Sequence, residues 1–122
     1  MAKILKLKTI HQNRGSLTVL EKILPFSIKR IYCIYNVDDS VRGNHRHKKT
    51  FQAAICINGS CTISCQSSEV NKVVEYNLSN REDCFIVNPE DYHSMSNFSN
   101  DAVLIVLASE NYDPKDYIYE KY

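Results

Sequence analysis

Residues 41–61 read VRGNHRHKKTFQAAICINGSC and carry the clearest strand and turn signals in the chain. The apolar run Phe51–Ile57 is followed by Asn58 and Gly59, and then by a second apolar run, Cys61–Cys65. An Asn-Gly pair between two apolar runs favours a tight type I′ turn, because both central residues of that turn need positive φ. This stretch therefore predicts two strands joined by a tight hairpin turn.

The same alternation of short apolar runs and turn residues extends over most of the chain. The runs recur every eight to twelve positions or so, a spacing typical of a sandwich or barrel. Residues 101–109, DAVLIVLAS, are apolar on both faces, as expected of a strand that is buried on both sides or packs on a partner subunit. The strands predicted outside residues 41–61 are Ile4–Leu7, Leu17–Leu20, Ile31–Tyr35, Val73–Leu78, Cys84–Val87, His93–Phe98 and Ala102–Leu107.

Helix signals are confined to the C-terminal end of the chain. Asp113 is a candidate N-cap and Pro114 suits the first helical position, so one short helix is predicted there. Strands do not alternate with long helical segments, which argues against an α/β fold. We therefore expect an all-β fold, a double-sheet barrel or jelly roll with a short C-terminal helix, in a single domain spanning residues 1–122.

The composition is that of an ordinary globular domain. The 122 residues are 43% hydrophobic and 24% charged, which allows a core without disulfide staples. A net charge of +1 gives no electrostatic reason to bind nucleic acid or a membrane surface. The N-terminal MAKILKLKTI is too interrupted by lysine to be a signal peptide or a membrane span. Five cysteines without a CxxC pair are expected to be mostly buried thiols, typical of a reducing, cytoplasmic location.

Three histidines carry the chemical signal of the sequence. His45 and His47 are two residues apart, so their side chains project to the same side of a regular strand. His93 lies far along the chain, after the turn sequence NPED and Tyr92. Imidazoles with an ordinary pKa near 6.5 suit proton transfer at neutral pH, and three of them can also hold Zn²⁺ or Fe²⁺. The residues alone leave a proton-transfer site and a metal site as alternatives.

The order His45-x-His47, then Gln52, then a distant His93 with Asn97 resembles the motif skeleton of the cupins. Metal-binding cupins have a glutamate at the place of Gln52. A carboxylate is a better ligand for a divalent cation than a neutral amide oxygen. This departure favours a site without metal, and the alternative is a metal-dependent cupin enzyme with the three histidines as ligands.

Basic and aromatic residues could complete a binding site around the histidines. Guanidinium groups pair well with phosphate oxygens, and a near-neutral protein must concentrate positive charge locally to bind a diphosphate. Tyrosines can stack on a base or hydrogen-bond a sugar, although a single tyrosine is more often core or rim, and a charge cluster more often a solvated face. The candidates are Arg14, Arg30, Arg42, Arg46, Lys48, Lys49, Tyr32, Tyr35, Tyr92 and Tyr112.

The segments NRGSLTVLE, PFSIKRIYCIY, RGNHRHKK, INGSC and DAVLIVLASENYDPKDYI resemble the dTDP-4-keto-6-deoxyglucose 3,4-ketoisomerases, small cupins of deoxysugar biosynthesis. The likeness runs from Arg14 to Ile118. It implies a double-stranded β-helix that acts without metal or other cofactor, as a homodimer with exchanged N-terminal strands. It also implies that a dTDP-linked 4-keto-6-deoxyhexose is converted to its 3-keto isomer, which feeds an aminotransferase that makes a 3-amino-3,6-dideoxysugar for lipopolysaccharide or another glycan.

The resemblance also implies roles for individual residues. His45 is expected to be the general base and acid that carries a proton between C3 and C4, and His47 to support the proton movements at the oxygens. Arg14 and His93 match the branch whose product is dTDP-3-keto-6-deoxy-D-galactose. A tyrosine and an arginine at these two places go with the gluco product, which is the alternative outcome.

Four more residues are expected to contact substrate. Arg42 or Tyr35 would stabilise the enediolate oxygens in a pocket shielded from water. Lys48 and Gln52 complete the predicted substrate-binding set. A stand-alone, non-catalytic sugar-binding cupin is the alternative of a different class.

Two departures from the family pattern lie next to the predicted site. The family commonly has an alanine where this chain has Arg46, and we expect that side chain to point away from the histidines. A segment similar to VWHEM in the family reads DYHSM here, with Tyr92 for tryptophan and Ser94 for glutamate. The second departure is expected to alter the pocket wall near His93.

Overall fold

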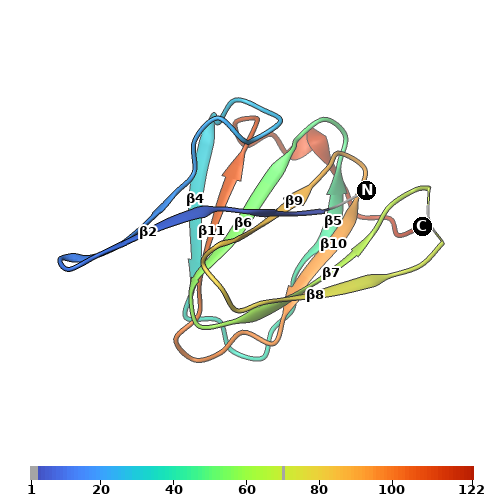
Figure 1. Ribbon diagram of the computed structural model, residues 1–122. Coiled ribbons are helices and arrows are strands. Elements are labelled where there is room, and N and C mark those ends of the chain that lie inside the picture. The colour runs from blue at the N-terminus through green and yellow to red at the C-terminus, as the bar shows by residue number, and fades with distance from the viewer. Residues whose placement is uncertain (1–2, 70) are drawn as a thin grey trace.

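The computed structural model describes residues 3–69 and 71–122 as two facing antiparallel sheets and a separate hairpin (Figure 1). The first sheet contains, in order, β1 (Lys3–Lys6), β9 (Asp83–Val87), β6 (Gln52–Asn58), β11 (Val103–Ala108) and β4 (Arg30–Tyr35). The second contains β12 (Tyr117–Ile118), β5 (Arg42–His47), β10 (Tyr92–Ser96), β7 (Cys61–Gln66) and β8 (Val74–Leu78). The hairpin pairs β2 (Lys8–Gln12) with β3 (Gly15–Val19). The predicted all-β jelly roll is confirmed.

The core between the sheets follows from the two-residue period of the strands. In β7 the side chains alternate, so that Cys61, Ile63 and Cys65 are buried while their neighbours are half-buried. These residues pack with fully buried Phe85 and Leu104 from the first sheet. Each such side chain contributes about 1.5–3 kcal/mol through removal from water. This apolar core holds the two sheets together.

The first sheet is also covered on its outer face. Ala53, Ile86 and Leu107 are buried there in a second apolar cluster, against half-buried Leu24 and Phe26 from the connection before β4. The central strands β6, β9 and β11 are therefore buried on both sides. The two-sided burial predicted for residues 101–109 is confirmed.

The connection between β6 and β7 differs from the predicted hairpin. The two strands belong to different sheets and do not pair, and Gly59 has positive φ (68°) whereas Asn58 does not. Asn58 Nδ2 donates to the Asp101 carbonyl at 2.9 Å, and a Cβ on Gly59 would lie 2.8 Å from the Ala102 Cα. The type I′ hairpin prediction is wrong, because local turn propensity does not specify which strand the next one will pair with.

The predicted elements otherwise coincide closely with the observed ones. Each predicted apolar run overlaps a strand. The C-terminal helix is a single 3₁₀ turn, Pro114–Asp116, and Asp113 is its N-cap as predicted, accepting from the Lys115 N–H. Strands β2, β5 and β12 were not among the predicted runs, since KTIHQ, RGNHRH and YI lack a clear apolar run. Among the residues described, no helix has the length and apolar character needed to span a membrane.

Candidate active site

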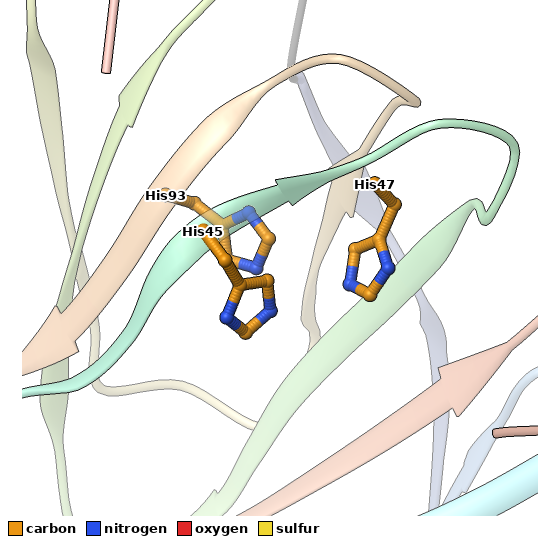
Figure 2. A group of neighbouring side chains, drawn as sticks. All are labelled: His45, His47 and His93. Carbon is orange, nitrogen blue, oxygen red and sulfur yellow. The ribbon is translucent and has the colours of Figure 1, made fainter. Parts of the chain in front are cut away.

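Three histidines meet between the two sheets (Figure 2). His45 and His47 come from β5, and His93 lies directly opposite His45 on β10. The ring of His45 is 4.9 Å from that of His47 and 4.9 Å from that of His93, measured between centroids. Only 3% of the surface of His47 and of His93 is exposed, and His45 is half-buried. The predicted same-side placement of His45 and His47 is confirmed.

A backbone irregularity in β5 aims the first of these side chains. Pairing with β10 shifts register so that His45 faces His93 but Gly43 faces Ser94, which leaves Asn44 as an extra residue. Gly43 (φ 90°) and Asn44 (φ 58°) both have positive φ. A Cβ on Gly43 would lie 3.0 Å from the His93 carbonyl oxygen, so only glycine lets the strands approach this closely. Bulges of this kind commonly redirect side chains at active sites.

Each imidazole has one nitrogen bound to an acceptor. His45 Nδ1 donates to the Gly43 carbonyl at 3.0 Å, His93 Nδ1 to the Asp91 carbonyl at 3.0 Å, and His47 Nδ1 to Asp116 Oδ2 at 3.0 Å. Carbonyl and carboxylate oxygens only accept, so Nδ1 carries the proton in each ring and Nε2 has a free lone pair. Figure 2 shows the three rings turned toward one another. His47 Nε2 is buried and has no hydrogen-bond partner among the residues described.

Burial keeps these rings neutral. It lowers the pKa of His45 to about 4, reinforced by the nearby His47 and opposed by the bond to Gly43. Burial likewise lowers the pKa of His93 to about 3. It also lowers the pKa of His47, although the carboxylate of Asp116 acts in the opposite sense. At neutral pH the cluster therefore presents proton acceptors, not cations.

The C-terminal segment completes one wall of the site. Tyr117 on β12 pairs with His47 on β5, and its ring centroid lies 4.7 Å from that of His45 and 4.5 Å from that of His47. The preceding residue, Asp116, holds His47 Nδ1. Sequence reasoning missed both residues, since the segment carried only a helix signal and no motif that refers to the histidines. A pairing between strands far apart in the sequence brings them here.

A small cavity lies beside His93 inside the sandwich. Gln52 and Tyr32 form its polar side together with His93, and apolar residues such as Val87 and Met95 form the rest. The Gln52 Nε2 donates to the Tyr32 hydroxyl at 3.0 Å. Of the three histidines, His93 thus borders a small enclosed space that has few but directed polar groups.

Positive charge lies close to the Tyr32 hydroxyl. Burial raises the pKa of the Tyr32 hydroxyl, and the charges of Arg30 and Arg42 oppose that rise. The Arg30 guanidinium lies 4.5 Å from the centroid of the Tyr32 ring and 5.4 Å from that of Tyr112. Arg42, a predicted substrate contact, is thus within electrostatic reach of the cavity at the start of β5. Guanidinium groups in this position suit a phosphorylated ligand.

The whole chain, residues 1–122, matches the protein family described as FdtA: WxcM-like, C-terminal. The chain belongs to this family. The TDP-4-oxo-6-deoxy-alpha-D-glucose-3,4-oxoisomerase of Aneurinibacillus thermoaerophilus is 40% identical over 119 residues, which cover 95% of this chain and 84% of that one.

Two solved structures extend the likeness of this FdtA-family chain to the fold. One is the QdtA 3,4-ketoisomerase from Thermoanaerobacterium thermosaccharolyticum, a double variant in complex with TDP. It is 40% identical with a TM-score of 0.91, over 98% of this chain and 87% of that one. The other is WlaRA, the TDP-fucose-3,4-ketoisomerase from Campylobacter jejuni, which is 37% identical with a TM-score of 0.89, over 98% and 89% of the two chains. The FdtA-family chain is an isomerase.

Three predicted substrate contacts lie away from the histidines within this FdtA-family chain. Arg14 is exposed in the turn of the β2–β3 hairpin, which extends away from the two sheets (Figure 1). Tyr35 is 61% exposed and shares the outer face of β4 with Ile31 and Cys33. Lys48 is exposed just past the end of β5. A single chain therefore brings together His45, His47, His93 and Gln52, with Arg42 nearby, but not these three.

The two departures from the family pattern point away from the cavity. Arg46 forms an ion pair with Glu90 at 2.8 Å and donates to the Tyr122 hydroxyl at 2.7 Å, so its side chain faces away from the histidines as expected. Tyr92 and Ser94 alternate with buried His93 and lie on the opposite face of β10. The expected change in the pocket wall is wrong, because neighbouring residues on a strand point to opposite sides.

The histidine cluster could also hold a metal ion. One ligand atom from each of His45, His47 and His93 lies within 4.8 Å of the others. Gln52, at the place of the cupin glutamate, gives its amide N–H to Tyr32. The donor set is therefore three neutral imidazoles with no carboxylate, which suits Zn²⁺ better than a hard cation.

Proposed function

We propose that this enzyme converts dTDP-4-keto-6-deoxy-D-glucose to dTDP-3-keto-6-deoxy-D-galactose. The observation that carries the proposal is the group of three neutral imidazoles, two buried and one half-buried, each of which bonds an acceptor through Nδ1 and so leaves Nε2 unprotonated, with His93 bordering a small cavity. Proton transfer between adjacent carbons of a keto sugar needs proton acceptors of this kind and no redox cofactor. The names of the three relatives reported above describe 3,4-ketoisomerases or an oxoisomerase that act on TDP-linked sugars or are bound to TDP, and they support the substrate class.

His45 is the proposed carrier of the carbon-bound proton. The C4 carbonyl acidifies the hydrogen on C3, and His45 Nε2 accepts it to form an enediol. The same imidazolium then returns the proton to C4. Nδ1 stays bonded to the Gly43 carbonyl throughout, so the ring keeps its orientation while Nε2 gains and loses the proton.

His47 is the proposed carrier at the oxygens. Removal of the C3 hydrogen leaves the negative charge of the enediolate on O4, and formation of the C3 ketone requires the C3 hydroxyl to lose its proton. His47 Nε2 can accept the proton from O3, and as imidazolium it can donate to O4, with its Nδ1–H retained by Asp116. Substrate and product are isomers, so no proton or electron is gained or lost overall.

The predicted substrate contacts divide into two groups. Gln52 and His93 border the cavity, and Arg42 lies near it, so these residues are proposed to contact the sugar or its diphosphate from within one chain. Within one chain, Arg14, Tyr35 and Lys48 lie away from the histidines. We place them in substrate binding through the assembly described next.

The enzyme is proposed to be a homodimer with exchanged N-terminal strands. In the single chain β1 pairs with β9, and the hairpin that follows extends from the body with Leu17 60% exposed. Exchange of these segments would bring the Arg14 of one copy toward the site of the other. It would also cover the exposed apolar side chains of β4, among them Ile31 and Tyr35.

The galacto outcome is proposed from two residues, Arg14 and His93. The crystallised QdtA double variant replaces one tyrosine by arginine and one arginine by histidine. These are the residue types that this chain has at Arg14 and His93, where tyrosine and arginine go with the gluco product in the family pattern. The 3-keto product carries a carbonyl that an aminotransferase can use, so we place the reaction in 3-amino-3,6-dideoxysugar synthesis in the cytoplasm.

The experiment that tests the function is NMR analysis of the product formed from dTDP-4-keto-6-deoxyglucose. An axial hydroxyl at C4 beside a C3 ketone identifies the galacto product, and an equatorial hydroxyl identifies the gluco product. Unchanged substrate under conditions in which a related ketoisomerase turns over would refute the proposal. The geometry of the three histidines favours one second candidate, a metal-dependent cupin enzyme, which metal analysis distinguishes below.

A further inference from the structure

Asp116 is a buried carboxylate whose side-chain hydrogen bonds all go to residues 47–50. Only 4% of its surface is exposed. Its Oδ1 accepts from the Lys49 N–H at 2.8 Å, and its Oδ2 accepts from His47 Nδ1 at 3.0 Å and from the Thr50 hydroxyl. Burial opposes ionisation of Asp116, but these hydrogen bonds outweigh it and lower the pKa of the carboxyl. The side chain is therefore an ionised acceptor at neutral pH.

The backbone fixes where this carboxylate sits. Asp116 ends the 3₁₀ turn that Asp113 caps, and the next residue, Tyr117, pairs with His47 in the β12–β5 ladder. The Asp116 carbonyl accepts from the Lys48 N–H at 2.9 Å. Main-chain bonds on both sides thus hold Asp116 against His47 independently of the contact between the two side chains.

The other end of His47 shows what this contact can do. Nε2 is buried, lacks a hydrogen-bond partner among the residues described, and belongs to the ring that lies 4.9 Å from His45. A purely structural contact between β12 and β5 would not explain why His47 keeps a buried, unpaired nitrogen on the side of the other histidines. A buried orphan nitrogen costs about 1–3 kcal/mol, which a substrate group would recover by bonding to it.

We propose that Asp116 is a positioning residue for the isomerisation: it holds His47 as the Nδ1–H tautomer and directs Nε2, as a proton acceptor, at the sugar oxygens. The inference rests on the proposed function for its chemistry. Asp116 does not touch substrate. It sets the orientation and tautomer of the imidazole and stabilises the imidazolium that forms while His47 carries a proton.

The substitution Asp116→Asn separates this role from simple fastening. The Lys49 N–H needs an acceptor, so the amide oxygen takes the place of Oδ1 and the NH₂ group faces His47 Nδ1 and the Thr50 hydroxyl. A donor opposite Nδ1 favours the other tautomer, in which Nε2 carries the proton. The variant keeps the shape of the side chain while reversing the polarity of one hydrogen bond.

The test measures tautomer and turnover on the full-length protein. We expect ¹⁵N-edited NMR of the imidazoles to show His47 protonated on Nδ1 in the wild type and on Nε2 in Asp116→Asn. With dTDP-4-keto-6-deoxyglucose as substrate, kcat should fall about 10- to 100-fold, as for other residues that orient a functional imidazole. KM should change little, because Asp116 makes no substrate contact.

Two further variants provide the controls. Asp113→Asn makes the same substitution three residues earlier, and since asparagine also caps helices well, turnover and the His47 tautomer should match the wild type. Asp116→Glu keeps an acceptor-only carboxylate and should retain the Nδ1–H tautomer and recover part of kcat. Failure of Asp116→Glu to recover any kcat while it retains the tautomer would contradict the proposal.

The remaining outcomes are distinguishable. A folded Asp116→Asn enzyme with wild-type kcat would overturn the proposal, as would a wild-type His47 protonated on Nε2. If Asp116→Asn does not fold, the tautomer of His47 in the wild type decides alone: protonation on Nδ1 supports the positioning role, and protonation on Nε2 overturns it. A wild-type enzyme that leaves the dTDP-sugar unchanged would refute the proposed function, while the tautomer measurement, which needs no substrate, would still decide the role of Asp116.

Discussion

His45 and His93 lie directly opposite each other on β5 and β10, with ring centroids 4.9 Å apart and ring planes at 74°. Each Nδ1 donates to a backbone carbonyl two residues earlier in the chain, that of Gly43 for His45 and that of Asp91 for His93. The backbone thus sets the tautomer of both rings without any other side chain. The two rings differ in exposure, since His45 is half-buried whereas His93 is buried.

Replacement of His45 tests the proposed proton carrier. In His45→Asn the side chain can no longer accept and return a proton, and we expect kcat to fall by about 10²- to 10⁴-fold, the usual contribution of a general base. Binding of dTDP, measured by calorimetry, should be retained, since the imidazole is proposed to act on the sugar ring. Turnover close to that of the wild type would remove His45 from the mechanism.

The stereochemistry of the product should depend on Arg14 and His93 together. We expect the double variant Arg14→Tyr/His93→Arg to shift the product toward 3-keto-6-deoxyglucose, by the family pattern stated above. The product ratio is read by NMR at fixed conversion, and each single variant serves as the control for the other position. A double variant that yields only the galacto product would show that other residues set the configuration at C4.

The pH dependence of catalysis should lack an inflection near 6.5. Burial lowers the pKa of His45 to about 4, so the proton-accepting form persists as the pH falls below the ordinary histidine range. We expect kcat/KM to stay level through pH 6.5 and to decline only as the pH approaches the lowered value. Circular dichroism at each pH monitors folding. A midpoint near 6.5 in a folded enzyme would mean that the active base is an ordinary, solvated histidine.

Chelation separates the two enzyme proposals. We expect protein purified without chelator to keep its full ketoisomerase activity after exhaustive treatment with EDTA, because the proposed proton transfers use only imidazoles. Elemental analysis of the same samples reports bound metal. One transition-metal ion per chain whose removal abolishes activity, and whose return restores it, would favour the metal-dependent cupin with His45, His47 and His93 as ligands.

The substitution Gly59→Ala should destabilise the fold. A Cβ at this position would lie 2.3 Å from Ser99 Oγ and 2.8 Å from the Ala102 Cα, and Gly59 has a φ of 68°. Strain at positive φ alone costs about 1 kcal/mol or more for an alanine, and the backbone clash adds to it. We expect a lower free energy of unfolding by denaturant titration. The matched control is Gly15→Ala, where a Cβ meets nothing within 4 Å, so that only backbone strain contributes.

The sequence predicted those features of the site that depend only on neighbouring residues. The alternation of side chains along a strand placed His45 and His47 on one side, and Arg46 on the other, before any strand pairing was known. The apolar runs located the strands because burial of alternate residues is a local pattern. The hairpin predicted at Asn58-Gly59 was wrong because the residues of a turn specify a local bend and not which sheet the next strand joins.

What the sequence by itself determined is thus the class of fold, most of the strands and the residue types able to move a proton. Only the tertiary structure decided which groups meet. The strand register sets His93 against His45, and a ladder between β12 and β5 brings Asp116 to His47 across 69 positions. Such pairings depend on how two sheets close over a shared core, a property of the whole chain that no short segment encodes.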